Sequence, residues 1–414
     1  MFDQLFARQA AVARHRSAPY AAERERFLRY LATRHYSLTS RRRAAHDLLA
    51  IVLQTDLAGQ RRVTLGMVRE ATRHRSSLHR GCRRPSGEHI RESLRRTATA
   101  WMAFLGKLVA DPEPVTRDTV VLKQFETFLR DERGLALSTI KRCCWHARRL
   151  LDHLTSAGRA LKRIRLEDVD SYISALTMAG WRRPSLPGVA DAVRSFLRFT
   201  QSRRLCMPGL ADGVAAPRIY ADERLPEGLE WATVTRLIAS SRGDSANDIR
   251  DHALFLLLSV YGLRCSEIQA LRLDDINWDN GTISVRRPKQ RHTQQYPLEA
   301  TTGQAILKYL REARPRTECR QVFLNLLAPT RPITRISIHH AVRKRLRALG
   351  LHGPRRGPHA LRHACARRLL SNGFTFKQVG DHLGHRSSAA TRIYAKVDLN
   401  SLREVAEIDL RGIL

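Results

Sequence analysis

The segment PHALRHACARRLLSNG, residues 358–373, holds two histidines and an arginine within five positions. His359, Arg362 and His363 stand at i, i+3 and i+4, so a helix would place all three on one face. Such a face suits three uses: a metal site, a basic helix lying on nucleic acid, or part of a catalytic constellation. The rest of the chain must supply the partners that decide between these uses.

The charge of the chain indicates a polyanionic partner. Its 414 residues include 73 lysines and arginines against 39 aspartates and glutamates, a formal net charge of +34. This surplus of positive charge favours nucleic acid as the binding partner. A membrane surface is the alternative, but no apolar run reaches the roughly 18–20 residues of a spanning helix. The N-terminal stretch also lacks the apolar core of a signal peptide.

The cysteines and histidines do not form a metal-binding pattern. The seven cysteines show no CxxC pair and no metal-ligand spacing, and an odd, scattered set indicates reduced thiols in a reducing compartment. His359 and His363 lack a third ligand at zinc-like spacing and lack the glutamate of an H-E-x-x-H motif. We therefore expect neither a metal nor a cofactor.

The length of the chain predicts more than one domain, because 414 residues are more than a single hydrophobic core usually organises. Residues 1–112 have a helical pattern and are strongly basic. The part from Arg61 to Ala100 has eleven arginines and three acids, typical either of a solvated helix face or of a DNA-contacting arm. The prolines of ADPEPV, residues 110–115, indicate a linker after this part.

A compact helical domain is expected next, over residues 113–206. Its predicted helices are amphipathic and cover residues 120–133, 138–154, 166–179 and 188–203. Residues 207–227 are rich in proline and glycine, which indicates a second linker.

From residue 228 the pattern predicts a mainly helical domain with a small β-sheet, an α+β arrangement. Two helices precede a break at Gly262, and a strand–turn–strand follows in GTISVRR, PKQRHT and QQYPL. Further helices are expected at 301–313, 336–349, 359–372 and 375–383. In the last stretch, residues 399–414, apolar side chains repeat on a helical face. We expect this tail to dock on the same domain or on a neighbouring subunit.

Four separate segments of this domain hold residues suited to chemistry. Arg264 follows the Gly262 break in YGLRCSEIQALRLDDINW, with Glu267 three residues on, and Lys289 lies in the predicted hairpin turn. His359, Arg362 and His363 make the third set, and HLGHRSSAATRIYAKVD places His385 nine residues before Tyr394. Each of these segments alone is common in proteins, but the four together, in this order along the chain, form a specific pattern.

In that order, GLRCSEIQAL, PHALRHA, LGH and TRIYAKV resemble the tyrosine recombinase (phage integrase) family, in particular its Xer-like bacterial and mobile-element integrases. The resemblance covers residues 228–398 strongly, and residues 116–206 are similar to the helical, SAM-like core-binding domain of the family. Residues 1–112 resemble nothing specific. The resemblance implies six catalytic positions: Arg264, Lys289, His359, Arg362, His385 and Tyr394.

The turn of the hairpin departs from the family pattern. Lys289 stands eight residues before Pro297, as the family's hairpin lysine precedes its VPL segment, but RPKQRHTQQ replaces the usual G-K-G-x-K turn. No other lysine lies between Lys162 and Lys308, which supports the assignment of Lys289.

The resemblance implies phosphodiester transfer that needs no metal ion. Arg264 and Arg362 would contact the non-bridging oxygens of the phosphate, since a guanidinium binds two oxygens at once. Tyr394 would attack the phosphorus and form a 3′-phosphotyrosine. Because this linkage keeps the energy of the phosphodiester bond, a DNA 5′-hydroxyl could later reverse it without ATP.

The remaining residues would assist these steps. His359 would act as the base for the tyrosine, and His385 would hydrogen-bond the phosphate. Lys289 would protonate the departing 5′-oxygen. Glu267 and His363 would support the residues in contact with DNA.

The function implied is a site-specific DNA recombinase or integrase of a mobile element. It would act as a homo-tetramer on double-stranded DNA with sequential strand exchange, helped by sister recombinases or DNA-bending proteins, in the bacterial cytoplasm at the nucleoid. The helix Ser138–Leu154, around Lys141, and the basic segment Arg61–Arg96 are its expected DNA-binding surfaces.

Two other functions stay open. The first is a regulatory DNA-binding protein that keeps the fold without the chemistry, against which the complete set of six residues argues. The second is strand relaxation of the type IB topoisomerase kind. The hairpin, the LGH motif and the extra basic N-terminal domain favour recombination over relaxation.

Overall fold

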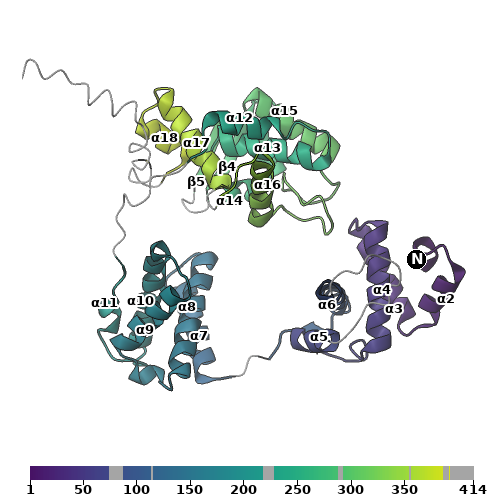
Figure 1. The fold of residues 1–414 in the computed structure, drawn as a ribbon, viewed down its shortest axis with the longest axis horizontal. Coiled ribbons are helices and arrows are strands. Elements are labelled where there is room, and N and C mark those ends of the chain that lie inside the picture. The colour runs from purple at the N-terminus through teal and green to yellow at the C-terminus, as the bar shows by residue number, and fades with distance from the viewer. Residues whose placement is uncertain are drawn as a thin grey trace, which may run out of the picture. The chain divides into compact units, whose positions relative to one another are not determined.

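The structure is a computed structural model that describes residues 1–73, 87–112, 115–217, 228–287, 292–353, 356–385 and 391. The chain divides into two compact units, Ala110–Arg224 and the stretches Met1–Val109 and Leu225–Leu414 taken together. The described residues are mostly helical, with one three-stranded antiparallel sheet and one pair of very short parallel strands (Figure 1). The predicted fold class is therefore confirmed. No described helix is long and apolar enough to span a membrane.

Residues 1–109 enclose a hydrophobic core of their own. The described helices are α1 (Phe2–Leu5), α2 (Gln9–Ser17), α3 (Ala21–Thr33), α4 (Leu38–Gln54), α5 (Leu65–Thr72) and α6 (Gly87–Phe104). The buried carboxylate of Asp47 joins α4 to α6, because it accepts hydrogen bonds from Ser93 (2.8 Å) and Thr97 (2.9 Å). The sequence pattern missed the parallel strands β1 (Val63–Thr64) and β2 (Leu108–Val109), since two residues carry no periodicity.

His15 of α2 is buried in this core against two phenylalanine rings. Its ring stacks on Phe6 at 4.6 Å and on Phe2 at 5.2 Å between centroids, and neither ring nitrogen has a hydrogen-bond partner among the described residues. Burial first, and then the charges of His46 and Arg24, lower the pKa of His15 to about 4. The folded protein therefore holds this imidazole neutral.

The pKa of His15 gives a pH dependence of stability with a defined sign. Between pH 6.5 and 4 the unfolded chain binds a proton that folded His15 does not, so unfolding becomes easier as the pH falls. His15→Phe keeps a ring between Phe2 and Phe6. Between pH 7.5 and 5, the free energy of unfolding of this variant should fall by about 1–2 kcal/mol less than that of the wild type. Thermal unfolding at both pH values measures this loss. The exposed His89→Phe is the control, and equal pH dependence in both variants would contradict the assignment.

The unit Ala110–Arg224 is a bundle of amphipathic helices around a second core. Its helices are α7 (Arg117–Thr127), extended by a π-helical turn at Phe128–Glu132, then α8 (Leu137–Ser156), α9 (Leu166–Met178), α10 (Leu186–Ser202) and the short α11 (Leu210–Gly213). Leu161–Arg163 and Arg183–Ser185 form single 3-10 turns. Phe125 and Phe196 meet edge to face at 5.2 Å in the core. The four helices expected in this part of the chain are all present.

Residues 228–391 contain the helices that hold His359 and Arg362 and that flank Arg264 and His385. They are α12 (Trp231–Ala239), α13 (Ala246–Val260), α14 (Cys265–Ala270), α15 (Ala300–Lys308) with a π-helical turn at Tyr309–Ala313, α16 (Arg335–Ala348), α17 (Pro358–Ser371) and α18 (Phe376–Leu383). The strands are β3 (Ile276–Asn277), β4 (Thr282–Arg287) and β5 (His292–Pro297), and a 3-10 turn covers Leu273–Asp275.

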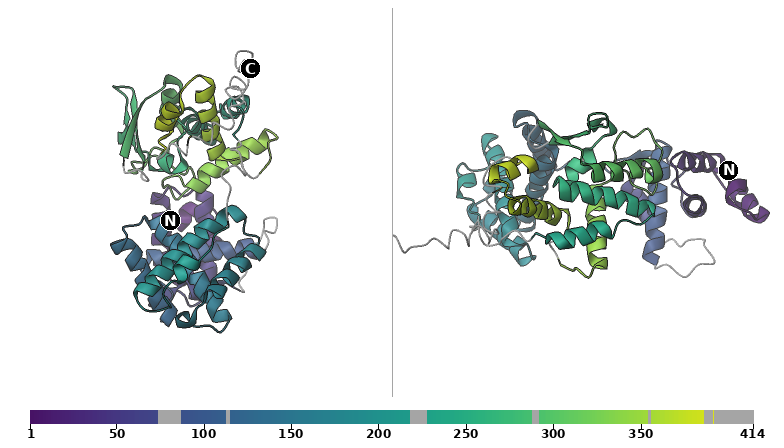
Figure 2. Two further views of the ribbon diagram at one scale, coloured as in Figure 1. Left: turned by 90° about the vertical axis from the view of Figure 1, so that its left-hand side faces the viewer. Right: turned by 90° about the horizontal axis from the view of Figure 1, so that it is seen from above.

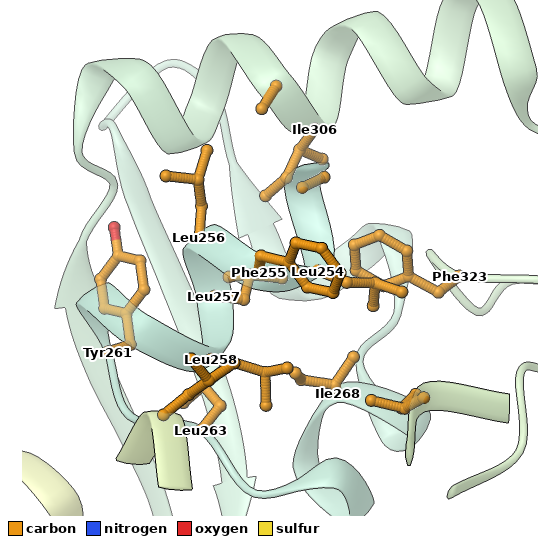
Figure 3. Packing of buried hydrophobic residues seen from close by; sticks show 14 of the residues in the cluster. Leu254, Phe255, Leu256, Leu257, Leu258, Tyr261, Leu263, Ile268, Ile306 and Phe323 are labelled. Atoms are coloured by element: carbon orange, nitrogen blue, oxygen red, sulfur yellow. The ribbon is translucent and has the colours of Figure 1, made fainter. Parts of the chain in front are cut away.

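Helix α13 lies at the centre of this core. Five successive residues from Leu254 to Leu258 are buried, so the helix is apolar on every side rather than along one stripe. Figure 3 shows Ile306, Ile268 and Phe323 around it, each from a different part of the chain. Helix α17 also packs on α13, and this contact positions the helix that bears His359 and Arg362.

The sheet places one arginine on its inner face. Strand order is β3-β4-β5, and the register pairs Ile283 with Tyr296 and Arg287 with His292. Along β4 every second residue is buried, so Arg287 points inward with Ile283 and Val285. Figure 2 shows the strands at the side of the helices of this part of the chain. The short strand β3 was not predicted.

Candidate active site

The predicted catalytic residues come from segments far apart in the sequence. Arg264 immediately precedes α14, His359 and Arg362 lie in α17, and His385 follows α18. The end of α18 connects them, because Arg362 donates to the carbonyl of its last residue, Leu383, and Arg264 to the carbonyl of Gly384, which follows. Two of the six positions, Lys289 and Tyr394, lie outside the described residues.

Arg264 is held by the buried carboxylate of Glu267. Nη1 of Arg264 donates to Oε1 of Glu267 at 2.8 Å, while the backbone N–H of Arg264 donates to Oε2 at 2.8 Å. Glu267 therefore caps α14 and fixes the guanidinium with the same side chain. Arg264 is 27% exposed and Glu267 only 2%, so the guanidinium is the member of the pair that faces solvent. The supporting role of Glu267 in catalysis stays a prediction.

Arg362 is a buried cation that donates to main-chain carbonyls. Its side chain is 4% exposed; Nη1 donates to the Gly262 carbonyl at 2.6 Å and Nη2 to the Leu383 carbonyl at 2.7 Å. These bonds join α17 to the break before Arg264 and to the end of α18. The guanidinium thus has a fixed place between the two loops.

Both acceptor loops need glycine. Gly262 has φ +60°, and Gly384 has the same φ of +60°, a left-handed conformation that costs other residues energy. A Cβ on Gly384 would also lie 2.5 Å from Nε of the buried Arg287. The glycines of the GLR and LGH motifs are therefore required by backbone conformation and by close packing.

Arg287 is a site residue that sequence reasoning missed. It is 1% exposed, and its guanidinium donates to Glu267 (3.2 Å), to the carbonyls of Leu383 (2.6 Å) and His382 (3.2 Å), and to the hydroxyl of Tyr296. A signal was present in the sequence, since alternation along GTISVRR puts position 287 on the inner face of the strand. A charge at such a position needs buried partners.

His385 is held neutral beside these arginines. Burial first, and then the charges of Arg362, Arg264 and Arg287, lower the pKa of His385 to about 4. Its Nδ1 lies 2.7 Å from the hydroxyl oxygen of Thr391. A neutral imidazole offers one donor and one acceptor at pH 7, so His385 is suited to hydrogen bonding rather than to carrying charge.

His359 and His363 differ in exposure although they lie one turn apart on α17. His359 is exposed, whereas His363 is half-buried, and burial followed by the charges of His359 and Arg362 lowers the pKa of His363 to about 4. Among the described residues, no group of three His, Cys, Asp or Glu side chains could hold a metal ion.

The expected DNA-binding helix carries a basic and aromatic surface. On α8 the exposed residues include Lys141, Arg148, Arg149 and Trp145. The guanidinium of Arg149 lies 4.8 Å from the Trp145 ring centroid, and Trp145 stacks on Trp181 at 5.8 Å. In the basic segment Arg61–Arg96, helix α5 and the first part of α6 are described, while residues 74–86 lie outside the described residues.

The fold is that of the tyrosine recombinases. The XerH site-specific recombinase, solved in a post-cleavage complex with a palindromic difH substrate, superposes with a TM-score of 0.57. The match covers 69% of this chain and 84% of that one, at 20% sequence identity. At this identity the comparison bears on the fold alone.

Sequence comparison assigns the family. Residues 228–400 match the phage integrase family, and residues 122–204 match the N-terminal SAM-like domain of phage integrases. A Sinorhizobium fredii protein named as a candidate integrase/recombinase, y4rA, is 35% identical over 288 residues, 69% of either chain. The tyrosine recombinase XerD of Yersinia pestis is 27% identical over 70% of this chain and 96% of its own length. The chain belongs to the phage integrase family of tyrosine recombinases, whose members are DNA strand transferases.

Proposed function

We propose that this protein is a site-specific recombinase that breaks and rejoins double-stranded DNA through a phosphotyrosine at Tyr394. The observation that carries the proposal is the convergence of Arg264, Arg362 and His385 at the end of α18. Around this point lie three guanidiniums: those of Arg264 and Arg287 pair with the carboxylate of Glu267, and that of Arg362 donates to main-chain carbonyls. This excess of positive charge suits a phosphodiester and the further negative charge of its transition state.

In the proposed reaction the Tyr394 oxygen attacks the scissile phosphorus, and the bond to the 5′-oxygen breaks. His359 accepts the phenolic proton, and Lys289 donates a proton to the departing 5′-oxygen. Arg264 and Arg362 bind the non-bridging oxygens, with a hydrogen bond from neutral His385. Attack by a 5′-hydroxyl from a second duplex then releases Tyr394 and joins the new strand.

The assembly proposed is a homo-tetramer that holds two duplexes and exchanges strands in sequence. Residues 113–206, with the basic face of α8, and residues 228–398 would bind the duplex, and the segment Arg61–Arg96 would add a further contact. The tail 399–414 would dock on a neighbouring subunit. The integrase names of the relatives favour integration or excision of a mobile element at the bacterial nucleoid, with accessory proteins that select the task.

Covalent capture tests this proposal and identifies the target site in the same experiment. Sheared genomic DNA of the source organism is incubated with the protein, denatured with SDS, and sequenced from the protein-bound ends, while mass spectrometry identifies the modified residue. We expect the adduct at Tyr394, its loss in Tyr394→Phe, and its retention in the control Tyr30→Phe, which changes an exposed tyrosine of α3.

Several outcomes would contradict the proposal. An adduct that persists in Tyr394→Phe, or one on another residue, would refute the nucleophile. Binding without any adduct would favour a regulatory DNA-binding protein. Relaxation of supercoiled DNA without joining of two duplexes would favour a topoisomerase.

A further inference from the structure

Arg287 shares an acceptor with each of the two arginines proposed to bind phosphate. Oε1 of Glu267 accepts from Arg264 at 2.8 Å and from Arg287 at 3.2 Å. The Leu383 carbonyl accepts from Arg362 at 2.7 Å and from Arg287 at 2.6 Å. Arg287 is therefore the central cation of a chain of three guanidiniums.

The same side chain ties the sheet to the end of α18, just before His385. Arg287 donates to the His382 carbonyl at 3.2 Å and to the Tyr296 hydroxyl, and that hydroxyl donates to the His382 carbonyl as well. The amide of Gln294 adds a bond to the Asp381 carbonyl at 2.8 Å. The end of α18 is thus fixed to β4 and β5 by a connected set of hydrogen bonds.

Burial excludes a direct contact between Arg287 and DNA in this arrangement. Its side chain is 1% exposed, and Gly384 packs directly against the guanidinium. Removing a charge from water is unfavourable unless partners compensate for the lost hydration. Here the compensating acceptors are the ones that hold Arg264 and Arg362, so the effect of Arg287 must pass through their positions.

We propose that Arg287 is a positioning residue for DNA strand transfer: it fixes Glu267 and the end of α18, residues 382–384, so that Arg264 and Arg362 meet the same phosphate. This inference rests on the proposed function. It predicts that Arg287 acts on the rate of the chemical step and leaves the affinity for DNA nearly unchanged, because the surface in contact with the duplex does not include it.

Single-turnover cleavage separates these effects. The probe is a duplex of the sequence recovered by covalent capture, nicked beside the cleavage point so that the cleaved end is lost and the adduct accumulates. With the nicked duplex in excess, each active protein molecule forms one adduct. The amplitude therefore gives the active fraction of the protein, while the rate constant describes the folded molecules alone. If Arg287 only supports folding, its substitution lowers the amplitude and the melting temperature. If it positions the catalytic arginines, its substitution lowers the rate constant.

Arg287→Met, an apolar side chain of similar length, is expected to reduce this rate constant by roughly ten- to a hundredfold. The Kd for the intact duplex should stay within about threefold, since one buried side chain contributes no phosphate contact. Arg287→Lys should be intermediate, because an ammonium restores the charge without the planar fork that reaches several acceptors.

Arg314→Met is the matched control. Arg314 also donates its guanidinium to main-chain carbonyls, those of Cys319, Gln321 and Val322, but in another loop. The control should lose stability while its rate constant stays that of wild type. If Arg287→Met does not fold, Tyr296→Phe replaces it, because it removes the hydroxyl between Arg287 and the His382 carbonyl and should slow cleavage by about threefold or more.

Two results would overturn the inference. One is a wild-type rate constant in Arg287→Met, or in both Arg287→Lys and Tyr296→Phe if the methionine variant does not fold. The other is an equal loss of rate in Arg314→Met. Failure of the wild-type protein to form any adduct would instead refute the proposed function, so the two failures are distinguishable.

Discussion

Arg362→Met is expected to reduce the rate of covalent DNA cleavage by at least about a hundredfold, the cost of removing one preorganised donor from a developing negative charge. The substitution also leaves the buried carbonyls of Gly262 and Leu383 without one of their donors. Both effects act on the same loops, because these carbonyls border Arg264 and His385.

The measurement is single-turnover cleavage of the nicked duplex, together with DNA affinity and thermal unfolding. Arg368→Met is a matched control on the same helix. It removes an equal charge from an exposed position where the guanidinium lies 4.1 Å from the ring centroid of Trp231. We expect the control to cleave at nearly the wild-type rate. Similar losses in the two variants would show that Arg362 contributes only general positive charge.

Gly384→Ala is expected to abolish cleavage and to lower the melting temperature strongly. The residue would have to adopt φ +60°, which costs roughly 1–2 kcal/mol for a residue with a Cβ. Its new Cβ would then lie 2.5 Å from Nε of Arg287, a side chain buried too deeply to move aside. The end of α18 and Gly384, whose carbonyls accept from all three arginines, would have to shift.

Gly373→Ala separates the two causes. Gly373 has φ +85°, and a Cβ there would meet no heavy atom within 4 Å, so this variant has the backbone strain without the clash. Thermal unfolding and single-turnover cleavage of both variants measure the difference. We expect a small loss of stability and normal cleavage for Gly373→Ala. Equal behaviour of the two variants would mean that the packing of Arg287 against Gly384 is unimportant.

The sequence alone predicted the secondary structure well wherever the segments are long and periodic. The helices that became α8, α10, α13 and α17, and the hairpin of β4 and β5, were all expected. The strands β1, β2 and β3 were missed, because two-residue strands form only where tertiary contacts bring their partners alongside. The order of the GLR, HALRH and LGH segments also sufficed to indicate the family.

The tertiary structure decided how the site is held together. The sequence named Arg264, Arg362 and His385, and it indicated that Glu267 would support them. It did not reveal Arg287, nor the lowered pKa of His385, which depends first on burial and then on three guanidiniums from distant segments. The physical reason lies in the acceptors. Besides Glu267 and Tyr296, the acceptors in the described part of the chain include the main-chain carbonyls at 262 and 382–384. Every residue type has a carbonyl, so only the folded chain shows which ones converge on the three arginines.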